Sequence, residues 1–160
     1  MDSFDDDDFD FGELSDEERE EIEREMKAED ARVNKHPLML QAQEILNIVD
    51  YLLDSTDSET IDMYGGTLRE STMMLVVKLS SALRSDSYVI CMQSASIIRD
   101  HAEYLRLSNH MLTDSEAFDE KYITMFREEM ERFRELFKIW AKEIRDKENN
   151  FEDEWGLFLK

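Results

Sequence analysis

The stretch T-M-M-L-V-V-K-L-S-S-A-L, from Thr72 to Leu83, is the longest strongly apolar segment with helical spacing in this chain. Leu75, Leu79 and Ala82 recur at intervals of four and three residues, which places them on one face of an α-helix. The middle of the stretch, Met73 to Val77, is apolar nearly all round. Because such a helix belongs in a protein core, we expect it to be the most buried element of the fold.

The helix around this stretch is predicted to run from about Glu59 to Leu83. Gly65 and Gly66 interrupt it near its start, where they predict a bend or a close contact with another helix. The segment D-S-T-D-S-E, residues 54–59, is rich in capping residues. It is therefore expected to end the preceding helix and to cap this one.

Three further segments show the same one-sided periodicity. One follows Pro37, one follows R-S-D-S, and the longest is predicted from about Glu116 to Lys147. Their apolar positions are Leu38, Ala42, Ile45, Val49 and Leu52; Tyr88, Cys91, Ala95, Ile98, Ala102 and Leu105; and Tyr122, Phe126, Phe133, Phe137, Trp140 and Ile144. Four amphipathic helices with short connections favour an all-α fold, an antiparallel up-and-down four-helix bundle over residues 37–147.

Two charged segments flank the predicted bundle. Residues 1–14 are expected to be a disordered acidic tail, because they combine high charge with no periodicity. Ser15 and Glu18 then form a capping-box pattern that begins a polar helical arm over residues 15–36. Residues 148–160 form a second acidic tail, which carries Trp155 near its centre. We expect Trp155 to pack on the bundle, because a large apolar side chain is costly to leave in water.

Composition and charge narrow the functional classes. The 160 residues carry a net charge of −21, and only four are glycine and one proline, which favours long helices over turn-rich β folds. Residues 1–30 hold sixteen acids against three bases, a balance of −13, which leaves −8 for residues 31–160. An acidic chain lacks the general attraction that drives binding to nucleic acid or to anionic membranes. With no apolar run of membrane-spanning length, no visible signal peptide and one cysteine, a cytoplasmic location is expected.

The sequence does not contain the residue patterns that are typical of metal sites or catalytic centres. In an EF-hand reading of the opening acids, Phe11 stands where glycine is needed in one register, and two ligands are lost in the other. None of the three histidines follows a glutamate by three residues, as a di-metal bundle requires. His101 and His110 face opposite sides of a straight helix. Cys91 is expected to be a core residue. No catalytic residue, metal or cofactor is therefore predicted.

The segment Y-G-G-T-L-R-E-S-T-M-M-L-V-V-K-L-S-S-A, residues 64–82, resembles the signature helix of a four-helix-bundle family. That family is named for proteins encoded in 23S ribosomal RNA intervening sequences. Leu68 and Arg69 match its Leu-Arg pair, and Leu75 and Leu79 fall at its isoleucine positions. The similarity covers about residues 38–145. The resemblance implies a bundle that self-associates, and a related branch is basic and engages nucleic acid.

The departures from that family are specific. Val76 stands where the family has proline, Glu70 replaces its second arginine, and Ser81 and Ala82 replace Glu-Gly. Since this chain is acidic, the resemblance supports the bundle and self-association more than it supports binding to nucleic acid.

The tails are the strongest candidates for function. We expect a non-enzymatic, cytoplasmic protein that acts through protein–protein interaction and forms homo-oligomers. Its partner would present a basic surface with apolar pockets. The candidate partner-binding residues are Phe4, Phe9, Phe11, Trp155, Leu157 and Phe158. For the three phenylalanines at the N-terminus, partner binding and idle disorder both stay open. The alternative is an RNA-associated or nuclease-like protein, based on Arg99, Arg106 and His110.

Overall fold

The computed structural model describes residues 14–147 and 153–158, and every regular element within them is helical. The all-α prediction is confirmed for these residues. The chain divides into two compact units, Met1–Arg32 and Val33–Lys160. The elements are α1 (Asp16–Asn34), α2 (Pro37–Asp54), α3 (Ser58–Thr60), the π-helical segment η1 (Ile61–Gly65), α4 (Gly66–Arg84), α5 (Tyr88–Asp114) and α6 (Glu120–Asp146).

Helix α1 begins with the predicted capping box. The backbone N–H of Ser15 donates to Glu18 Oε2 at 2.8 Å, and the N–H of Glu18 donates to Ser15 Oγ at 3.3 Å. The Ser15 hydroxyl also donates to Glu18 Oε2 at 2.9 Å, and the bonds from the Ser15 N–H and hydroxyl hold the pKa of the Glu18 carboxyl below its ordinary value. Ile22 and Met26 are exposed. Residues 14–32 contain no buried side chain, so this stretch of helix is stabilised locally, by its cap and by ion pairs such as Lys27–Glu23.

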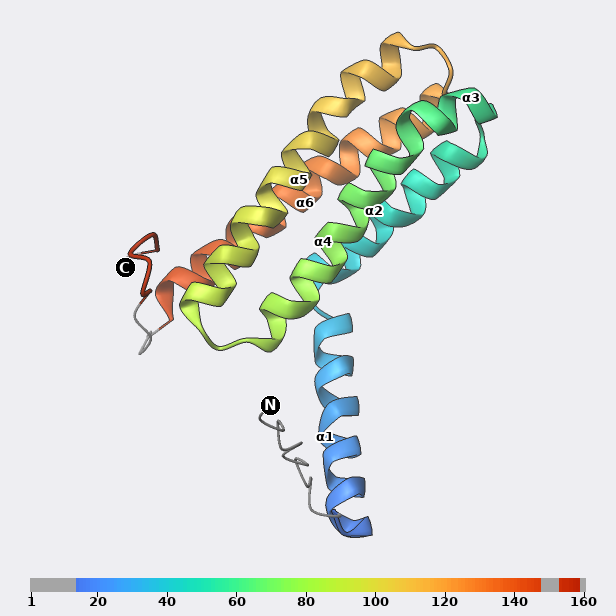
Figure 1. The fold of residues 1–160 in the computed structure, drawn as a ribbon. Coiled ribbons are helices and arrows are strands. Elements are labelled where there is room, and N and C mark those ends of the chain that lie inside the picture. The colour runs from blue at the N-terminus through green and yellow to red at the C-terminus, as the bar shows by residue number, and fades with distance from the viewer. Residues whose placement is uncertain (1–13, 148–152, 159–160) are drawn as a thin grey trace, which may run out of the picture. The chain divides into compact units, whose positions relative to one another are not determined.

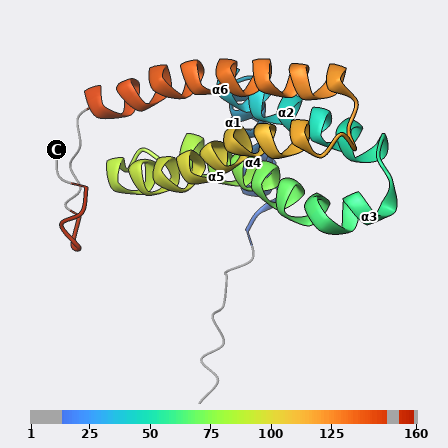
Figure 2. The same cartoon turned by 90° about the horizontal axis from the view of Figure 1, so that it is seen from above.

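The core lies in the second unit, between four long helices that run side by side in Figures 1 and 2. Helix α2 packs against α4 and α6, and α5 packs against the same two helices. The apolar positions predicted for α2 are all buried, as are Tyr88, Cys91, Ala95, Ile98 and Leu105 of α5. The largest side chains that are fully buried come from several helices: Phe126, Phe133, Leu38, Met39, Ile45, Ile48, Leu52, Leu53, Leu68, Leu75, Leu79 and Ile98.

The two adjacent glycines lie at the entry into α4, and a Cβ atom would meet a close neighbour only at Gly65. Asp57 caps α3 by accepting the N–H of Thr60 at 2.8 Å, and the π-helical turn η1 follows. A Cβ atom on Gly65 would lie 3.1 Å from Cγ2 of Ile61 and 3.6 Å from Cδ2 of Leu53 in α2. The tight distance is therefore to Ile61 within η1 itself, and the irregularity expected at the two glycines is the π-helical turn.

Helix α4 is less buried than expected. Leu75 is fully buried, but Met73 is 49% exposed and Val77 is 52% exposed. Helix α4 packs on two long neighbours, α2 and α5, and its outer side faces solvent. The prediction that Met73 to Val77 would form the most buried element is therefore wrong. Helix α2 buries eight residues and α4 buries six.

Helix α6 starts later than predicted, at Glu120 rather than near Glu116. Glu116 adopts a left-handed backbone conformation with φ of 53°, which is incompatible with a helix interior. The connection is instead drawn inward: Phe118 is buried, and the hydroxyl of Thr56 donates to the carbonyl of Ala117 at 2.8 Å. Asp119 then caps α6.

Polar groups also lie between the helices. His101 Nδ1 of α5 is 3.2 Å from Ser71 Oγ of α4, and His36 caps α2 by accepting the N–H of Leu38. His110 is exposed. Asn109 is buried, and among the described residues its side-chain amide has no hydrogen-bond partner. A buried amide without a partner costs about 1–3 kcal/mol, so this part of the core is not optimised for stability alone.

Candidate interaction sites

Residues 153–158, D-E-W-G-L-F, form a compact turn organised by one carboxylate. Asp153 Oδ2 accepts the backbone N–H groups of Leu157 at 2.8 Å and Phe158 at 2.7 Å. Its Oδ1 accepts the N–H of Trp155 at 3.1 Å. Gly156 has φ of 63°, the left-handed conformation that glycine adopts without strain. We call this element the C-terminal turn; an aspartate followed by a glycine is the chemistry that forms it.

The hydrogen bonds of the C-terminal turn also affect its titration. The N–H of Phe158, together with those of Trp155 and Leu157, holds the pKa of the Asp153 carboxyl below its ordinary value of 3.8. Because the folded pKa is the lower one, the ionised carboxylate stabilises the turn above pH 3.8. This contribution is lost as the pH falls through the folded pKa.

We predict that the C-terminal turn keeps its structure down to pH 3.8 and loosens only below it. The measurement is an NMR titration that follows the backbone amides of Leu157 and Phe158. Asp153→Asn should remove the transition, whereas Glu154→Gln, which changes an exposed acid beside it, should leave it in place. A midpoint at or above 3.8 for the wild-type turn would contradict these hydrogen bonds.

The turn presents its apolar side chains unequally. Trp155 is 93% exposed and Leu157 is 74% exposed, whereas Phe158 is partly buried and packs against the core. The expectation that Trp155 packs on the bundle is therefore wrong: Phe158 anchors the turn, and the bonds to Asp153 leave the indole in solvent. Burying one such side chain would be worth roughly 1.5–3 kcal/mol. The turn thus holds a large apolar surface in water.

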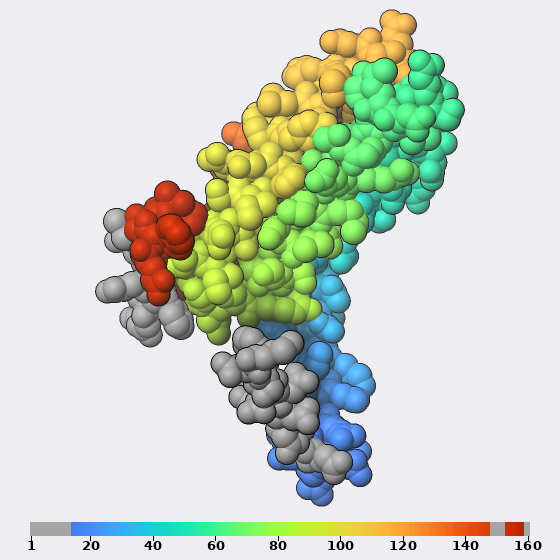
Figure 3. Space-filling view, in the orientation of Figure 1, coloured from blue at the N-terminus to red at the C-terminus, as the bar shows by residue number. Residues whose placement is uncertain are grey.

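The C-terminal turn lies beside the first part of α5. Figure 3 shows it as a separate patch next to the start of that helix. A hollow of about 450 Å³ separates the two, lined on the helix side by Val89, Gln93, Ser96 and Ile97. The turn is therefore held at an edge of the second unit, with Trp155 accessible there.

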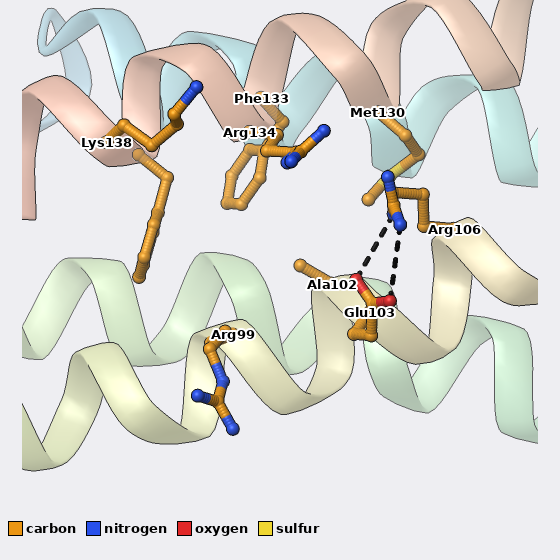
Figure 4. A pocket seen from close by; sticks show the side chains of 9 residues that line it. Arg99, Ala102, Glu103, Arg106, Met130, Phe133, Arg134 and Lys138 are labelled. Atoms are coloured by element: carbon orange, nitrogen blue, oxygen red, sulfur yellow. Dashed lines mark hydrogen bonds and ion pairs between the residues drawn. The ribbon is translucent and has the colours of Figure 1, made fainter.

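A second site, which we call the α5–α6 groove, lies between those two helices (Figure 4). It has a volume of about 390 Å³. Its apolar lining comes from Ala102, Met130, Phe133 and Phe137. Its charged lining comprises Arg99, Arg106, Arg134, Lys138 and one acid, Glu103. Four cations around an aromatic surface are unusual in a chain whose net charge is −21.

Each cation of the groove has an acidic neighbour. Arg106 donates to Glu103 and to Glu131, both at 3.2 Å, and Arg134 donates to Glu131 at 3.3 Å. The remaining pairs are Lys138–Glu135 and Arg99–Asp100. The hydrogen bond from Arg106 to Glu103, and to a smaller extent the one to Glu131, raises the pKa of the guanidinium. Exposed pairs of this kind contribute about 0–1 kcal/mol each, so an incoming carboxylate can replace one partner at little cost.

The other candidate residues predicted from the sequence lie in different places. Phe4, Phe9 and Phe11 lie outside the described residues. Arg99 and Arg106 both line the α5–α6 groove, but His110 does not. The groove was not predicted from the sequence because its lining comes from two different helices, whose side chains share one surface only once the helices pack. On α6, the sequence pattern that could have indicated this groove is the pair Arg134 and Lys138, two basic residues one helical turn apart.

A reactive cysteine, a metal site and a membrane-spanning helix are the other features that residues 14–147 and 153–158 could contain. Cys91 is a core residue, as expected: burial raises the pKa of its thiol, which donates to the carbonyl of Ala82. No group of three or more His, Cys, Asp or Glu side chains in this part of the chain is arranged to hold a metal ion. None of the helices described combines the length and apolarity needed to cross a membrane.

No protein-family model, curated protein or solved structure matches this chain. The resemblance of residues 64–82 to the family named for 23S ribosomal RNA intervening sequences therefore stays a prediction.

Proposed function

We propose that this chain is a non-enzymatic cytoplasmic protein that acts through protein–protein contact, on the scaffold of an antiparallel up-and-down four-helix bundle. The pairing of α2 and α5 with both α4 and α6 supports that scaffold. So do the short connections, residues 85–87 between α4 and α5 and residues 115–119 between α5 and α6. The bundle serves to hold the C-terminal turn in a fixed place.

The observation that carries the proposal is the exposure of Trp155 on an organised turn. Tryptophan is the residue type most often responsible for a large share of binding energy at protein interfaces. A segment whose backbone is ordered before binding loses less conformational entropy when a partner covers it. The three backbone bonds to Asp153 supply that order. Trp155 and Leu157 are therefore the anchors, and Phe158 fixes the turn to the core.

The chemistry of the turn defines its partner. Asp153 and Glu154 precede the anchors, so the partner surface is basic around an apolar pocket. Phe4, Phe9 and Phe11 have the same acidic and aromatic setting in the sequence, and they are candidates for a second contact of the same kind.

The test is partner retention by the full chain with one side chain changed. Trp155→Ala should reduce the amount of each retained protein strongly, because the anchor is removed without disturbing the core. Ile139→Ala is the matched control, since Ile139 is also an exposed apolar residue but lies on α6. Equal retention by both variants and the wild type would refute the role of Trp155.

An RNA-associated or nuclease-like role is the second candidate. It is favoured by one observation, the convergence of Arg99, Arg106, Arg134 and Lys138 on the α5–α6 groove. It ranks second because each of these cations already has an acidic neighbour and the chain is acidic overall. Tight RNA binding that weakens steeply with added salt would reverse this order.

A further inference from the structure

We propose that the α5–α6 groove of one copy binds the C-terminal turn of a second copy. This inference rests on the proposed function and names its partner: another molecule of the same chain. The turn calls for a surface that is basic with an apolar pocket, and the chain carries a surface of that chemistry itself.

The apolar parts of the two sites are complementary. The groove offers the partly exposed side chains of Phe137 and Ala102 between its charged edges, above the buried Phe133 and Met130. The turn offers Trp155, whose indole is almost wholly in solvent. Aromatic rings gain from edge-to-face or offset stacking beyond the area they bury, and Phe137 is the ring available for such a contact. Trp155 is therefore the side chain that enters the groove, with Leu157 beside it.

The charges are complementary as well. Glu154 is exposed next to Trp155 in the turn, and Arg99, Arg134 and Lys138 surround the groove. An arginine over the face of an indole also gains a cation–π interaction. The resident acids Asp100, Glu131 and Glu135 lie on exposed helix surfaces, so the arriving carboxylate of Glu154 competes with weak ion pairs rather than with buried ones.

The turn of one copy does not occupy the groove of the same copy. Its hollow uses Val89, Gln93, Ser96 and Ile97 of α5, whereas the groove uses Arg99, Ala102, Glu103 and Arg106. The two sets share no residue. Each copy therefore has both halves of the contact available at the same time. Such a contact is head-to-tail, and it builds a ring or a chain of copies rather than an isologous pair.

The net charge of −21 opposes association of two copies. This repulsion acts over long distances, and at physiological ionic strength it is screened beyond about 8 Å. The contact between the turn and the groove is short-range and largely apolar, so salt weakens it less. We therefore expect association to strengthen from low salt to physiological salt, the opposite of the trend for nucleic acid.

The test is sedimentation velocity of the full chain at physiological salt, from low micromolar to near-millimolar concentration. The wild type should associate as concentration rises. Trp155→Ala should weaken association roughly 30-fold by removing the anchor. Arg134→Glu should weaken it by about tenfold or more by placing an acid at the groove. Ile139→Ala, the control on α6, should associate like the wild type, and circular dichroism should show all four proteins equally helical.

Mixing the two defective variants separates this geometry from any other self-association. The Trp155→Ala copy keeps an intact groove, and the Arg134→Glu copy keeps an intact turn. Their mixture should form a dimer and nothing larger, because it has one working contact and two broken ends. A wild type that stays monomeric, variants that associate like the wild type, or a mixture without dimer would each overturn the proposal.

A labelled peptide of residues 148–160 identifies the occupant of the groove. It should bind Trp155→Ala copies and bind Arg134→Glu copies at least tenfold more weakly. A peptide of residues 1–14, which is also acidic and aromatic, should not compete for the site; binding of that peptide alone would overturn the assignment. If the wild type does not self-associate but Trp155→Ala still loses a protein partner, the proposed function stands and this inference falls.

Discussion

Replacing Leu75 by aspartate is expected to unfold the Val33–Lys160 unit. Leu75 is fully buried on the inner face of α4, between α2 and α5, which pack on either side of that helix. An unpaired carboxylate at this position would have to be desolvated without a partner, at a cost of several kcal/mol. The total stability of a domain of this size is about 5–15 kcal/mol, so most or all of it would be lost.

Met73→Asp is the matched control for this change. Met73 lies in the same stretch of α4, two residues away, but it is half exposed. Its replacement should change stability by about 0.5 kcal/mol or less, as at other surface positions. Chemical denaturation followed by circular dichroism measures both variants. If Leu75→Asp were as stable as Met73→Asp, the assignment of inner and outer faces on α4 would be wrong.

The helices could be predicted because their local signals agreed with their tertiary environment. The apolar positions of α2 and α5 recur at helical spacing, and the residues predicted for α2 are all buried. The helix caps could also be predicted, because the hydrogen bonds of Ser15 with Glu18 and of Asp57 with Thr60 join residues that are close in sequence. In each case the information lies within one or two turns of the chain.

The errors arose where distant packing decided the outcome. Met73 and Val77 are apolar but lie on the outer side of α4, because helix neighbours cover only part of its surface. The start of α6 moved to Glu120 because Phe118 is drawn into the core, which places Glu116 in a left-handed turn. The sequence also gives no sign that Asn109 would be buried without a partner.

One part of the candidate sites could be predicted from the sequence, and the other part depends on distant packing. The apolar residues of the C-terminal turn could be named from sequence, because Trp155, Leu157 and Phe158 are large apolar side chains in an acidic segment. Which of them faces solvent depends on Asp153, whose carboxylate binds three backbone N–H groups and leaves Trp155 outside. The α5–α6 groove could not be named, because Arg99 and Lys138 become neighbours of one surface only when the two helices pack.

A second large effect is expected in the fluorescence of Trp155. The chain has two tryptophans, and Trp140 is buried next to Phe137. Trp140→Phe conserves an aromatic core residue and leaves Trp155 as the sole indole reporter. In dilute solution we expect Trp155 to emit like a solvated indole and to be quenched fully by acrylamide. At high concentration, or with a bound partner, it should become shielded, because an anchor residue is buried at the centre of its interface.

Quencher accessibility of Trp155 in the Trp140→Phe chain, measured against concentration, is the most direct test of the proposal that the C-terminal turn is a docking element. Accessibility that is near complete in dilute solution and falls as the chains associate, with Arg134→Glu abolishing the fall, is the predicted result. Shielding already present in dilute solution would place the indole on its own copy. Full accessibility at every concentration would show that no second copy covers it.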